Sequence, residues 1–294
     1  MKKNKVAIIG LTGQSIFMNI DEFHKNGETK QANNIFIEPG GKGYNQAIAC
    51  AKLNMDVYYL TAVGNDSYAS VCEETMKKYN INTYYIRKEV NTALATIITN
   101  SNGDNQVTVY KGANEYLNIC DLNKFKPVIE KCDILLAQNE IPYEVLKEAI
   151  IFAKEKGLKV IYNPAPAIYD INDIIEYVDV IIPNESEASI IYKDINNIKI
   201  DNDLRLIITK GSKGCTFIDK NISKDYSSIK VKSIDTTGAG DVFCSAITSQ
   251  IVNNKNIDEI INFATIASGL HVQKKYVIDA IPTLEEIEKY KKEL

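Results

Sequence analysis

Short apolar runs that alternate with amphipathic stretches are the feature that most restricts how this chain can fold. Six runs have the length and composition of buried strands: residues 6–10, 57–63, 134–137, 160–163, 180–183 and 206–209. Amphipathic stretches at 44–53, 68–79 and 142–156 lie between them and repeat apolar residues at helical spacing. This alternation predicts an α/β fold in which helices cover a mainly parallel sheet.

Two segments, about 15–39 and 92–110, are instead rich in β-forming residues and turn signals. Asn102-Gly103 separates two short β-type runs and predicts a hairpin, and Asn26-Gly27 marks a turn in the first segment. Ligands of open α/β sheets bind at the carboxyl ends of the strands, where a small β-sheet would act as a lid. We therefore expect a single domain over residues 1–294 with a β-lid built from these two segments. Exposed sheet edges and apolar faces are usually covered, so the lid is a candidate homodimer surface.

The composition argues against several classes of protein. The 294 residues are 45% hydrophobic and carry a formal net charge of −4 without a basic block, which disfavours nucleic acid as a partner. The longest apolar runs are far shorter than the ~20 residues of a membrane span, and the run at 6–10 is too short for a signal peptide. Six scattered cysteines and two histidines disfavour disulfides, a zinc site and a Ser-His-Asp triad. These features predict a cytoplasmic protein with no membrane partner.

The strongest functional signal is the string Asp235-Thr236-Thr237-Gly238-Ala239-Gly240-Asp241, which runs directly into a buried helix pattern. Small residues at the start of a helix bring free N–H groups together, and with the helix dipole these groups form an anion site. A carboxylate at Asp241 would stand beside a phosphoryl group bound there and could take the proton of an attacking hydroxyl. The structural alternative is a glycine turn followed by a helix-capping aspartate. The length of the string favours phosphoryl transfer.

A second glycine-rich string, Pro39-Gly40-Gly41-Lys42-Gly43-Tyr44-Asn45-Gln46-Ala47, leads into the first amphipathic stretch. Its glycines allow close backbone approach to a ligand, and Lys42 and Asn45 supply polar groups that bind hydroxyls. It is not a Walker A loop, because the GxxxxGK[ST] spacing is absent. Taken alone, the segment fits a flexible turn before a helix equally well.

Together the two strings resemble the signature motifs of the ribokinase family, the phosphofructokinase-B type of sugar kinases. The resemblance extends nearly end to end, because residues 138–140, 163–167, 183–188 and 209–214 carry further family strings in the family's order. It implies a ribokinase-like three-layer sandwich with a mainly parallel central sheet and a small β-lid. It also implies an enzyme that uses ATP and Mg²⁺ to phosphorylate a hydroxyl of a small, ribose-like sugar.

The resemblance also implies roles for individual residues. The catalytic base matches Asp241, and the anion hole matches Gly238, Ala239 and Gly240. The sugar-binding positions match Gly41, Lys42, Asn45 and Glu140. The nucleotide-binding loop matches Thr209, Gly211 and Ser212. The motif that binds the phosphates and positions Mg²⁺ through water matches Asn184 and Glu187. Without the family, the Asn184 to Glu187 segment is more typical of a solvated helix start.

One departure from the family pattern concerns the sugar side. An ungapped alignment from Gly10 to the Gly27-Glu28-Thr29 turn places Ser15 where the family has an aspartate that holds two substrate hydroxyls. A serine cannot form that charge-assisted bidentate contact. Either the substrate is not ribose, or another group compensates. Asp21 lies six residues further on, and we expect it within a lid strand.

A second departure lies in the family's monovalent-cation loop near the C-terminus. Asp235 and the carbonyl of Thr237 are candidate K⁺ ligands, but Ala280 replaces the serine hydroxyl of the family. Carbonyl ligands do not depend on side-chain identity, so the residues leave a potassium site open.

Three functions follow from these residues. The first is an active kinase of ribose or a related sugar. The second is a kinase of a nucleoside or another modified sugar, which Ser15 favours. The third is a non-catalytic homologue that binds sugar or nucleotide. The intact Asp241, Asn184 and Glu187 argue against the third.

Overall fold

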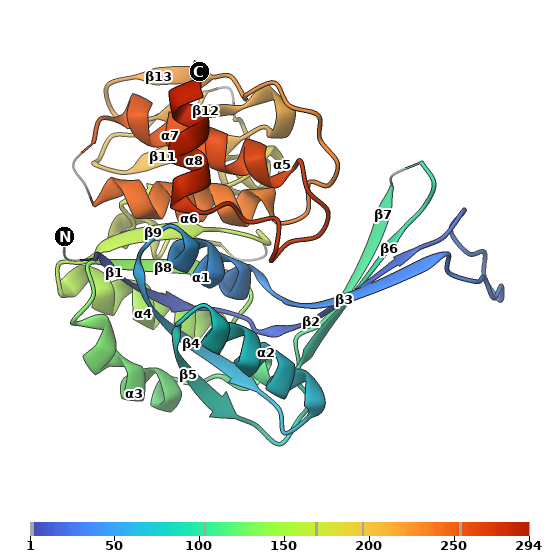
Figure 1. The fold of residues 1–294 in the computed structure, drawn as a ribbon. Helices are drawn as coiled ribbons and strands as arrows, with labels where there is room; N and C mark the ends of the chain where they lie inside the picture. The colour runs from blue at the N-terminus through green and yellow to red at the C-terminus, as the bar shows by residue number, and fades with distance from the viewer. Residues whose placement is uncertain (1–2, 103, 168–169, 196, 253–254, 294) are drawn as a thin grey trace.

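A nine-stranded sheet runs through the centre of the computed structural model, which describes residues 3–293 apart from 103, 168–169, 196 and 253–254 (Figure 1). Its strands lie in the order β13-β12-β11-β10-β9-β8-β1-β4-β5. In chain order they are β1 (Lys5–Ile9), β4 (Asp56–Val63), β5 (Asn82–Arg87), β8 (Ile134–Gln138), β9 (Lys159–Asn163), β10 (Val180–Ile181), β11 (Arg205–Thr209), β12 (Cys215–Ile218) and β13 (Ser223–Tyr226). Neighbours from β11 to β5 are parallel, and β12 and β13 add an antiparallel edge.

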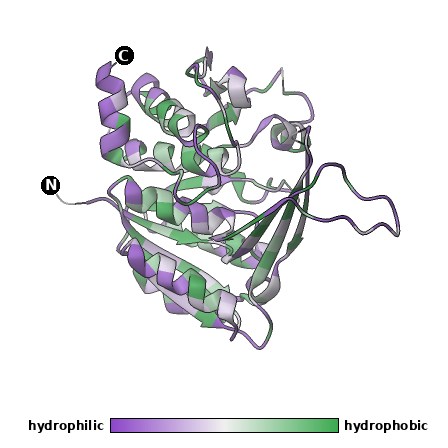
Figure 2. Cartoon of the chain, turned by 45° about the vertical axis from the view of Figure 1, so that its right-hand side comes forward, coloured by the Kyte–Doolittle hydropathy of each residue, from purple (hydrophilic) through white to green (hydrophobic). Residues whose placement is uncertain are grey.

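Helices cover both faces of this sheet. Successive side chains of a strand point to opposite faces, so a strand made of apolar residues presents an apolar surface on each side. Val6 and Ile8 of β1 pack into one core, whereas Ala7 and Ile9 pack into the other. The first core includes residues of α1 (Lys42–Lys52), α2 (Ser67–Lys78), α6 (Ala239–Ile251), α7 (Ile257–His271) and α8 (Leu284–Glu293). The second includes residues of α3 (Ile119–Ile129), α4 (Tyr143–Glu155) and α5 (Glu185–Tyr192). The expected three-layer α/β sandwich is confirmed, and its central strands are mainly hydrophobic in Figure 2.

Each of the six apolar runs forms a strand, with ends that shift by a few residues. The run at 180–183 gives only the two residues of β10, and it ends before Pro183, which has no N–H to donate to a neighbouring strand. Little of the string at 39–47 is a loop, despite its glycines. β3 continues to Gly40, and α1 already begins at Lys42. The described residues also form the short 3₁₀ turns η1 (Gly112–Tyr116), η2 (Ile175–Tyr177) and η3 (Gly211–Lys213). Among the described residues, no helix combines the length and hydropathy of a membrane span.

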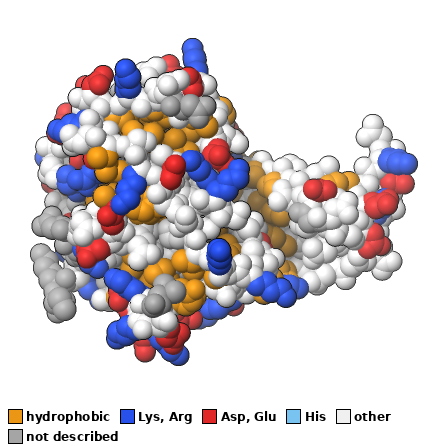
Figure 3. Space-filling model, turned by 90° about the horizontal axis from the view of Figure 1, so that it is seen from above, with side chains coloured by type: hydrophobic (Ala, Val, Ile, Leu, Met, Phe, Trp, Pro, Cys, Tyr) orange, Lys and Arg blue, Asp and Glu red, His pale blue; other side chains and the backbone are white. Residues whose placement is uncertain are grey.

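A second, four-stranded sheet projects from the body as an arm, and we call it the lid sheet (Figures 1 and 3). Its strands are β2 (Gly13–Asn19), β3 (Asn34–Gly40), β6 (Ala93–Thr99) and β7 (Asn105–Tyr110), in the order β3-β2-β6-β7. β2 and β6 are parallel, and the other two neighbouring pairs are antiparallel. Gly103, in the turn expected between β6 and β7, lies outside the described residues.

Asp21 lies outside the lid sheet, so the expectation that it belongs to a lid strand is wrong. β2 ends at Asn19, and Asp21 lies in the loop that leads to β3, although its carbonyl oxygen still accepts a hydrogen bond from the backbone N–H of Ser101 (3.2 Å). In that loop the side-chain amide of Asn33 donates a hydrogen bond to the Asp21 carboxylate (2.8 Å). This local contact satisfies Asp21 at the surface.

The base of the lid sheet is fixed to the loop between α7 and α8. The Glu38 carboxylate accepts hydrogen bonds from the backbone N–H groups of Val277 (2.8 Å) and Ile278 (3.1 Å). Phe36 stacks on Tyr276 of the same loop, with ring centroids 3.5 Å apart. The lid sheet is therefore joined to the C-terminal part of the chain as well as to β1 and α1.

Two glycines allow α1 to pack directly on β1. A Cβ on Gly10 would lie 2.7 Å from the Cα of Gly43, and a Cβ on Gly43 would lie 2.6 Å from the Cα of Gly10. β1 is also where the strand order diverges, with β8 on one side and β4 on the other. In open α/β sheets, ligands bind outside the carboxyl ends of the strands at such a switch point. The close packing thus fixes the N-terminus of α1 at this edge of the sheet.

Candidate active site

Helix α6 begins inside the string 235–241 with an uncapped N-terminus. Its N-cap is Gly238, whose φ of 79° is left-handed, and no side chain in the described part of the chain caps the first N–H groups. Ala239 and Gly240 follow in the first turn, and a Cβ added to Gly240 would meet no atom within 4 Å. Small residues therefore leave the N–H groups and the positive end of the helix dipole open to an anion.

Asp241 lies in the same turn, but its side chain is buried. Its carboxylate accepts hydrogen bonds from the side-chain amides of Asn45 (2.9 Å) and Gln46 (3.0 Å). Burial raises the pKa of Asp241, while the Lys42 ammonium and the two amides oppose that rise. A carboxylate of raised pKa at the edge of an anion site is well suited to accept a proton.

Buried amides extend behind Asp241. The Gln46 Nε2 that binds Asp241 also donates to Asn163 Oδ1 (3.3 Å), and the Gln46 oxygen accepts a hydrogen bond from Gln138 (2.5 Å). All three amide side chains belong to residues that are less than a tenth exposed. Since Gln46 has partners on both sides, its amide orientation is fixed, and it holds the Asp241 carboxylate in turn.

The string at 39–47 brings Lys42 to the same place. Gly41 has a φ of 114°, and a Cβ there would lie 2.4 Å from the carbonyl oxygen of Leu11, so only glycine fits. The backbone N–H of Lys42 donates to the Glu140 carboxylate (2.7 Å), and burial raises the pKa of Glu140 to about 7. Burial alone would lower the pKa of Lys42, but the carboxylates of Asp241 and Glu140 outweigh it and the net shift is upward.

A small cleft of about 110 Å³ joins these groups to the start of α5. Lys42, Asp241, Asn184 and Glu187 all line it. The Asn184 side chain accepts from the Glu187 N–H (2.8 Å), and the Glu187 carboxylate accepts from the Asn184 N–H (2.9 Å). The residues of the candidate Mg²⁺ motif are therefore also the residues that cap the start of α5. This capping box uses one carboxylate oxygen of Glu187. The second oxygen stays available to a metal-bound water.

A larger cleft of about 640 Å³ adjoins the small one, and the two share Asn184, Thr209 and Gly240. Gly211, with a φ of 55°, and Ser212 lie on its border. Its apolar lining includes Ile229, Val231, Phe243 and Val272. An apolar pocket that opens onto an anion site is the arrangement that a nucleotide base and its phosphates require.

Comparison with known proteins agrees with this geometry. Residues 3–284 match the model of the pfkB family of carbohydrate kinases. The chain belongs to this family. It is 35% identical over 305 residues to the ribokinase of Staphylococcus aureus, and the match covers 97% of this chain and 98% of that one. It is 30% identical over 301 residues to the deoxyribokinase of Salmonella typhi, with the same two coverages of 97% and 98%. The structure of Arabidopsis thaliana ribokinase complexed with ribose and ATP has a TM-score of 0.85 at 25% identity and 98% coverage of both chains.

As a pfkB family carbohydrate kinase, this chain is an enzyme that transfers a phosphoryl group from ATP to a hydroxyl of a sugar. The expected ribokinase-like fold and the expected class of enzyme are both confirmed. A non-catalytic binding protein is not the function that these comparisons support.

Ser15 is the candidate sugar-side residue at which the sequence is expected to depart from the family pattern. Ser15 is half-buried on β2, where it pairs with Glu38 and lies beside Gly40, and it borders neither of the two clefts. Glu38 does not replace the missing carboxylate, because its two oxygens accept the N–H groups of Val277 and Ile278. If Ser15 occupies the position of the diol-binding aspartate, as the sequence alignment predicts, β2 offers a serine there and no neighbouring carboxylate replaces it.

The candidate potassium ligands of this pfkB kinase fit a cation poorly. The Asp235 carboxylate already accepts the backbone N–H groups of Thr237 (2.9 Å) and Tyr276 (3.0 Å). The carbonyl oxygen of Thr237 lies 2.6 Å from Nε2 of His271, and Ala280 has no side-chain oxygen to add. A bound alkali cation needs several oxygens that converge on it, and here the chain's own donors engage them.

Sequence reasoning missed the buried polar residues around the site: Gln46, Gln138, Asn163 and His271. The signal for Gln46 was present, because Lys42, Asn45 and Gln46 follow the i, i+3, i+4 spacing of one helix face. Gln138 and Asn163 are the last residues of neighbouring parallel strands, whose ends meet at the binding edge of the sheet. Nothing in the sequence alone marks His271.

Proposed function

We propose that Asp241 is the general base of a sugar kinase and that the N-terminus of α6 is its anion hole. The observation that carries this proposal is the buried Asp241 carboxylate, held by Asn45 and Gln46 beside an uncapped helix N-terminus. The acceptor hydroxyl gives its proton to Asp241 while its oxygen bonds to the γ-phosphorus and the bond to ADP breaks. The N–H groups from Gly238 to Gly240 stabilise the charge on the transferring group.

Lys42 and Glu187 complete the phosphate side of this proposal. The Lys42 ammonium lies among the carboxylates of Asp241, Glu140 and Glu187, where it would balance the charge of a γ-phosphate. We assign the Mg²⁺ to Glu187 and Asn184, whose oxygens would bind it through water, and the metal would neutralise the phosphates. We assign the nucleotide to the larger cleft, with Thr209, Gly211 and Ser212 around its phosphates.

The acceptor is a small sugar, and Ser15 argues against ribose as the best one. Ribose presents vicinal hydroxyls that a carboxylate binds together, whereas Ser15 offers one uncharged hydroxyl. A 2-deoxy sugar lacks one of these two hydroxyls, and one of the relatives is a deoxyribokinase. A nucleoside or a modified sugar is the second candidate, because a substituent could occupy the space that the shorter side chain leaves.

An ADP-release assay with a panel of acceptors tests this function. The panel contains ribose, 2-deoxyribose, hexoses and nucleosides, each with Mg·ATP, and the Asp241→Asn variant provides the background. We expect at least one sugar to give turnover well above that background, with 2-deoxyribose or a substituted sugar ahead of ribose. A folded, ATP-binding protein that releases no ADP with any acceptor would contradict the proposal.

The outer face of the lid sheet supports a homodimer. Ile35 and Ile37 of β3 are 57% and 49% exposed, and they pair with Met18 and Ile16 of β2 on the same face. An exposed apolar face on a projecting sheet is usually covered, and a second copy of the lid sheet would cover it. Light scattering should then show a dimer for the parent and a monomer for Ile37→Lys. We place the enzyme in the cytoplasm, where ATP is available to it.

A further inference from the structure

The loop between α7 and α8, residues 272–283, lies directly behind the anion hole, and hydrogen bonds to other parts of the chain hold it on several sides. Its Tyr276 N–H is bound to Asp235, and its Val277 and Ile278 N–H groups are bound to Glu38. Tyr276 itself has a φ of 65°, a left-handed conformation that is uncommon for a bulky residue. The surrounding contacts therefore determine the shape of this loop.

His271 supplies the contact closest to the anion hole. Its side chain is fully buried at the end of α7, and Nε2 lies 2.6 Å from the carbonyl oxygen of Thr237. A carbonyl can only accept, so Nε2 must carry the hydrogen of this bond. A Cβ added to Gly238 would lie 3.3 Å from the same Nε2. The imidazole thus packs against the residue that caps α6 and fills the space beside the Thr237 oxygen.

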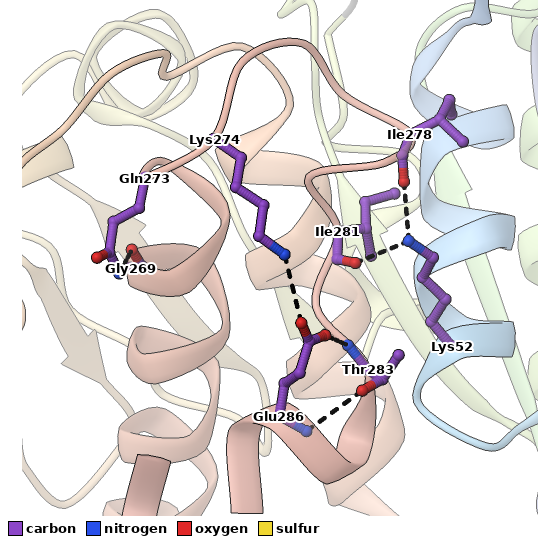
Figure 4. Close-up of polar contacts among 8 residues, drawn as sticks. All are labelled: Lys52, Gly269, Gln273, Lys274, Ile278, Ile281, Thr283 and Glu286. Atoms are coloured by element: carbon purple, nitrogen blue, oxygen red, sulfur yellow. Dashed lines mark hydrogen bonds and ion pairs between the residues drawn. The ribbon is translucent and has the colours of Figure 1, made fainter. Parts of the chain in front are cut away.

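Lys52 supplies a fixed positive charge to the other side of the loop. Its ammonium donates to the carbonyl oxygens of Ile278 (2.9 Å) and Ile281 (2.8 Å), as Figure 4 shows. Lys52 is the last residue of α1, the helix that begins at Lys42. The lysine therefore links the C-terminal loop to the helix that carries Lys42 and Asn45 into the active site.

We propose that His271 and Lys52 hold the turn before α6 and the loop between α7 and α8 in place, as a bound monovalent cation would, so that this kinase does not need potassium. The imidazole binds the Thr237 carbonyl. This hydrogen bond fixes the turn that presents the N–H groups at the start of α6. The ammonium neutralises loop carbonyls of the kind that an alkali cation would bind. His271 is a positioning residue in this proposal, since it acts on the anion hole through Thr237 and Gly238.

The first test uses the parent protein and needs no turnover. Thermal melts are measured in KCl and in tetramethylammonium chloride at equal ionic strength, because a cation that binds only the folded state raises Tm. We expect the two melting temperatures to agree within about 1 °C and the kinase activities to agree within about twofold. A potassium-dependent rise of several degrees, or an activation of fivefold or more, would overturn the proposal. If no acceptor is turned over, the melts still decide the potassium question, so its failure is separate from failure of the proposed function.

The second test addresses the imidazole itself. His271→Ala should lower kcat by about tenfold, as expected for a mispositioned anion hole, and leave the KM for sugar within about twofold. His271→Gln, whose amide can donate to the same carbonyl, should recover much of that loss. The matched control is Gln273→Ala, which removes an amide that donates to the Gly269 carbonyl near the end of the same helix (Figure 4). A parent-like kcat in His271→Ala, or no recovery in a folded His271→Gln, would overturn the role of the ring.

Discussion

The two ends of the proposed active site differ in how firmly contacts within the chain hold their side chains. On the phosphate side, the Asp241 carboxylate has two side-chain donors, and Asn184 and Glu187 cap each other. On the sugar side, β2 presents the uncharged Ser15 beside Gly40 at the base of the projecting lid sheet. The phosphate side is fixed from the core, whereas the sugar side is formed where the lid sheet joins the body.

The difference separates the reaction from its acceptor. Phosphoryl transfer makes the same demands whatever the acceptor is: an anion site, a base and a metal position. Binding a particular sugar depends on a few polar groups that can change without affecting those demands. In the proposed site, the phosphate side therefore carries the reaction common to the family, and the sugar side determines the choice of acceptor. The following variants test that separation, in order of decreasing effect.

Asp241→Asn should remove activity toward every acceptor. We expect turnover to fall at least ~10²-fold, as is typical for the loss of a positioned base, while folding and ATP binding remain. Steady-state kinetics and fluorescent-nucleotide binding measure the two effects. Near-normal turnover with any sugar would show that Asp241 is not the base.

Ser15→Asp should change the sugar side alone. A carboxylate that binds two hydroxyls of ribose adds about 1–3 kcal/mol of charge-assisted hydrogen bonding, which corresponds to roughly 5- to 150-fold in kcat/KM. The gain should be smaller for 2-deoxyribose, which lacks one of the hydroxyls, and the KM for ATP should not move. A parent that already uses ribose efficiently, and is impaired by Ser15→Asp, would show that the alignment of this loop is wrong.

Gln46→Met should weaken the support of the base without removing it. We expect kcat to fall by about tenfold, because the carboxylate loses one of two donors. The base acts in its ionised form, so activity is lost as the pH falls through the pKa of Asp241, which burial already raises. A lost donor raises that pKa further, and the acid limb of the pH profile should move to higher pH.

Gln250→Met is the matched control for this variant. Gln250 is also buried on α6, but its amide binds Ser249 and Lys255, away from the base. It should leave the acid limb where it is in the parent. If both variants shift the profile equally, the effect belongs to the stability of α6 and not to Gln46.

Glu187→Gln should have the smallest effect and should concern magnesium. We expect the Mg²⁺ concentration for half-maximal activity to rise by about threefold or more, with little change in the KM for sugar. Asp121→Asn is a suitable control, because Asp121 forms the capping box of α3 with Asn118 and lines neither cleft. A magnesium titration that is unchanged in Glu187→Gln would remove Glu187 from the metal site.

The strands that were predicted from the sequence are those that helices cover on both faces of the sheet. β1, β8 and β9 are continuous apolar runs because helices cover both faces of the sheet, and such runs are readable in a single sequence. The edge strands β12 and β13 were not expected. β13 reads Ser-Lys-Asp-Tyr, and its side chains are exposed or half-buried, so no apolar run marks it.

The same reasoning explains which parts of the site were predictable. Gly238 to Asp241 and Gly41 to Asn45 each lie in one short string, where spacing carries the information. The contacts of Gln46 with Asp241, Asn163 and Gln138 span 195, 117 and 92 residues of sequence. A local pattern cannot reveal contacts that only the strand order creates. Family resemblance supplied the motifs, but it did not indicate that His271 lies against Thr237.

The contact between Gly10 and Gly43 has a consequence for anyone who wishes to redirect this enzyme to a new acceptor. A methyl group at either position would fall within 3 Å of backbone atoms of the other, so no rotamer change could make room for it. A randomised library that includes residues 10 or 43 would consist mostly of misfolded clones. A more suitable position lies a few residues away on β2, where Ser15 is half-buried and already carries a side chain. Directed evolution should therefore vary the lid strand and leave the glycine pair untouched.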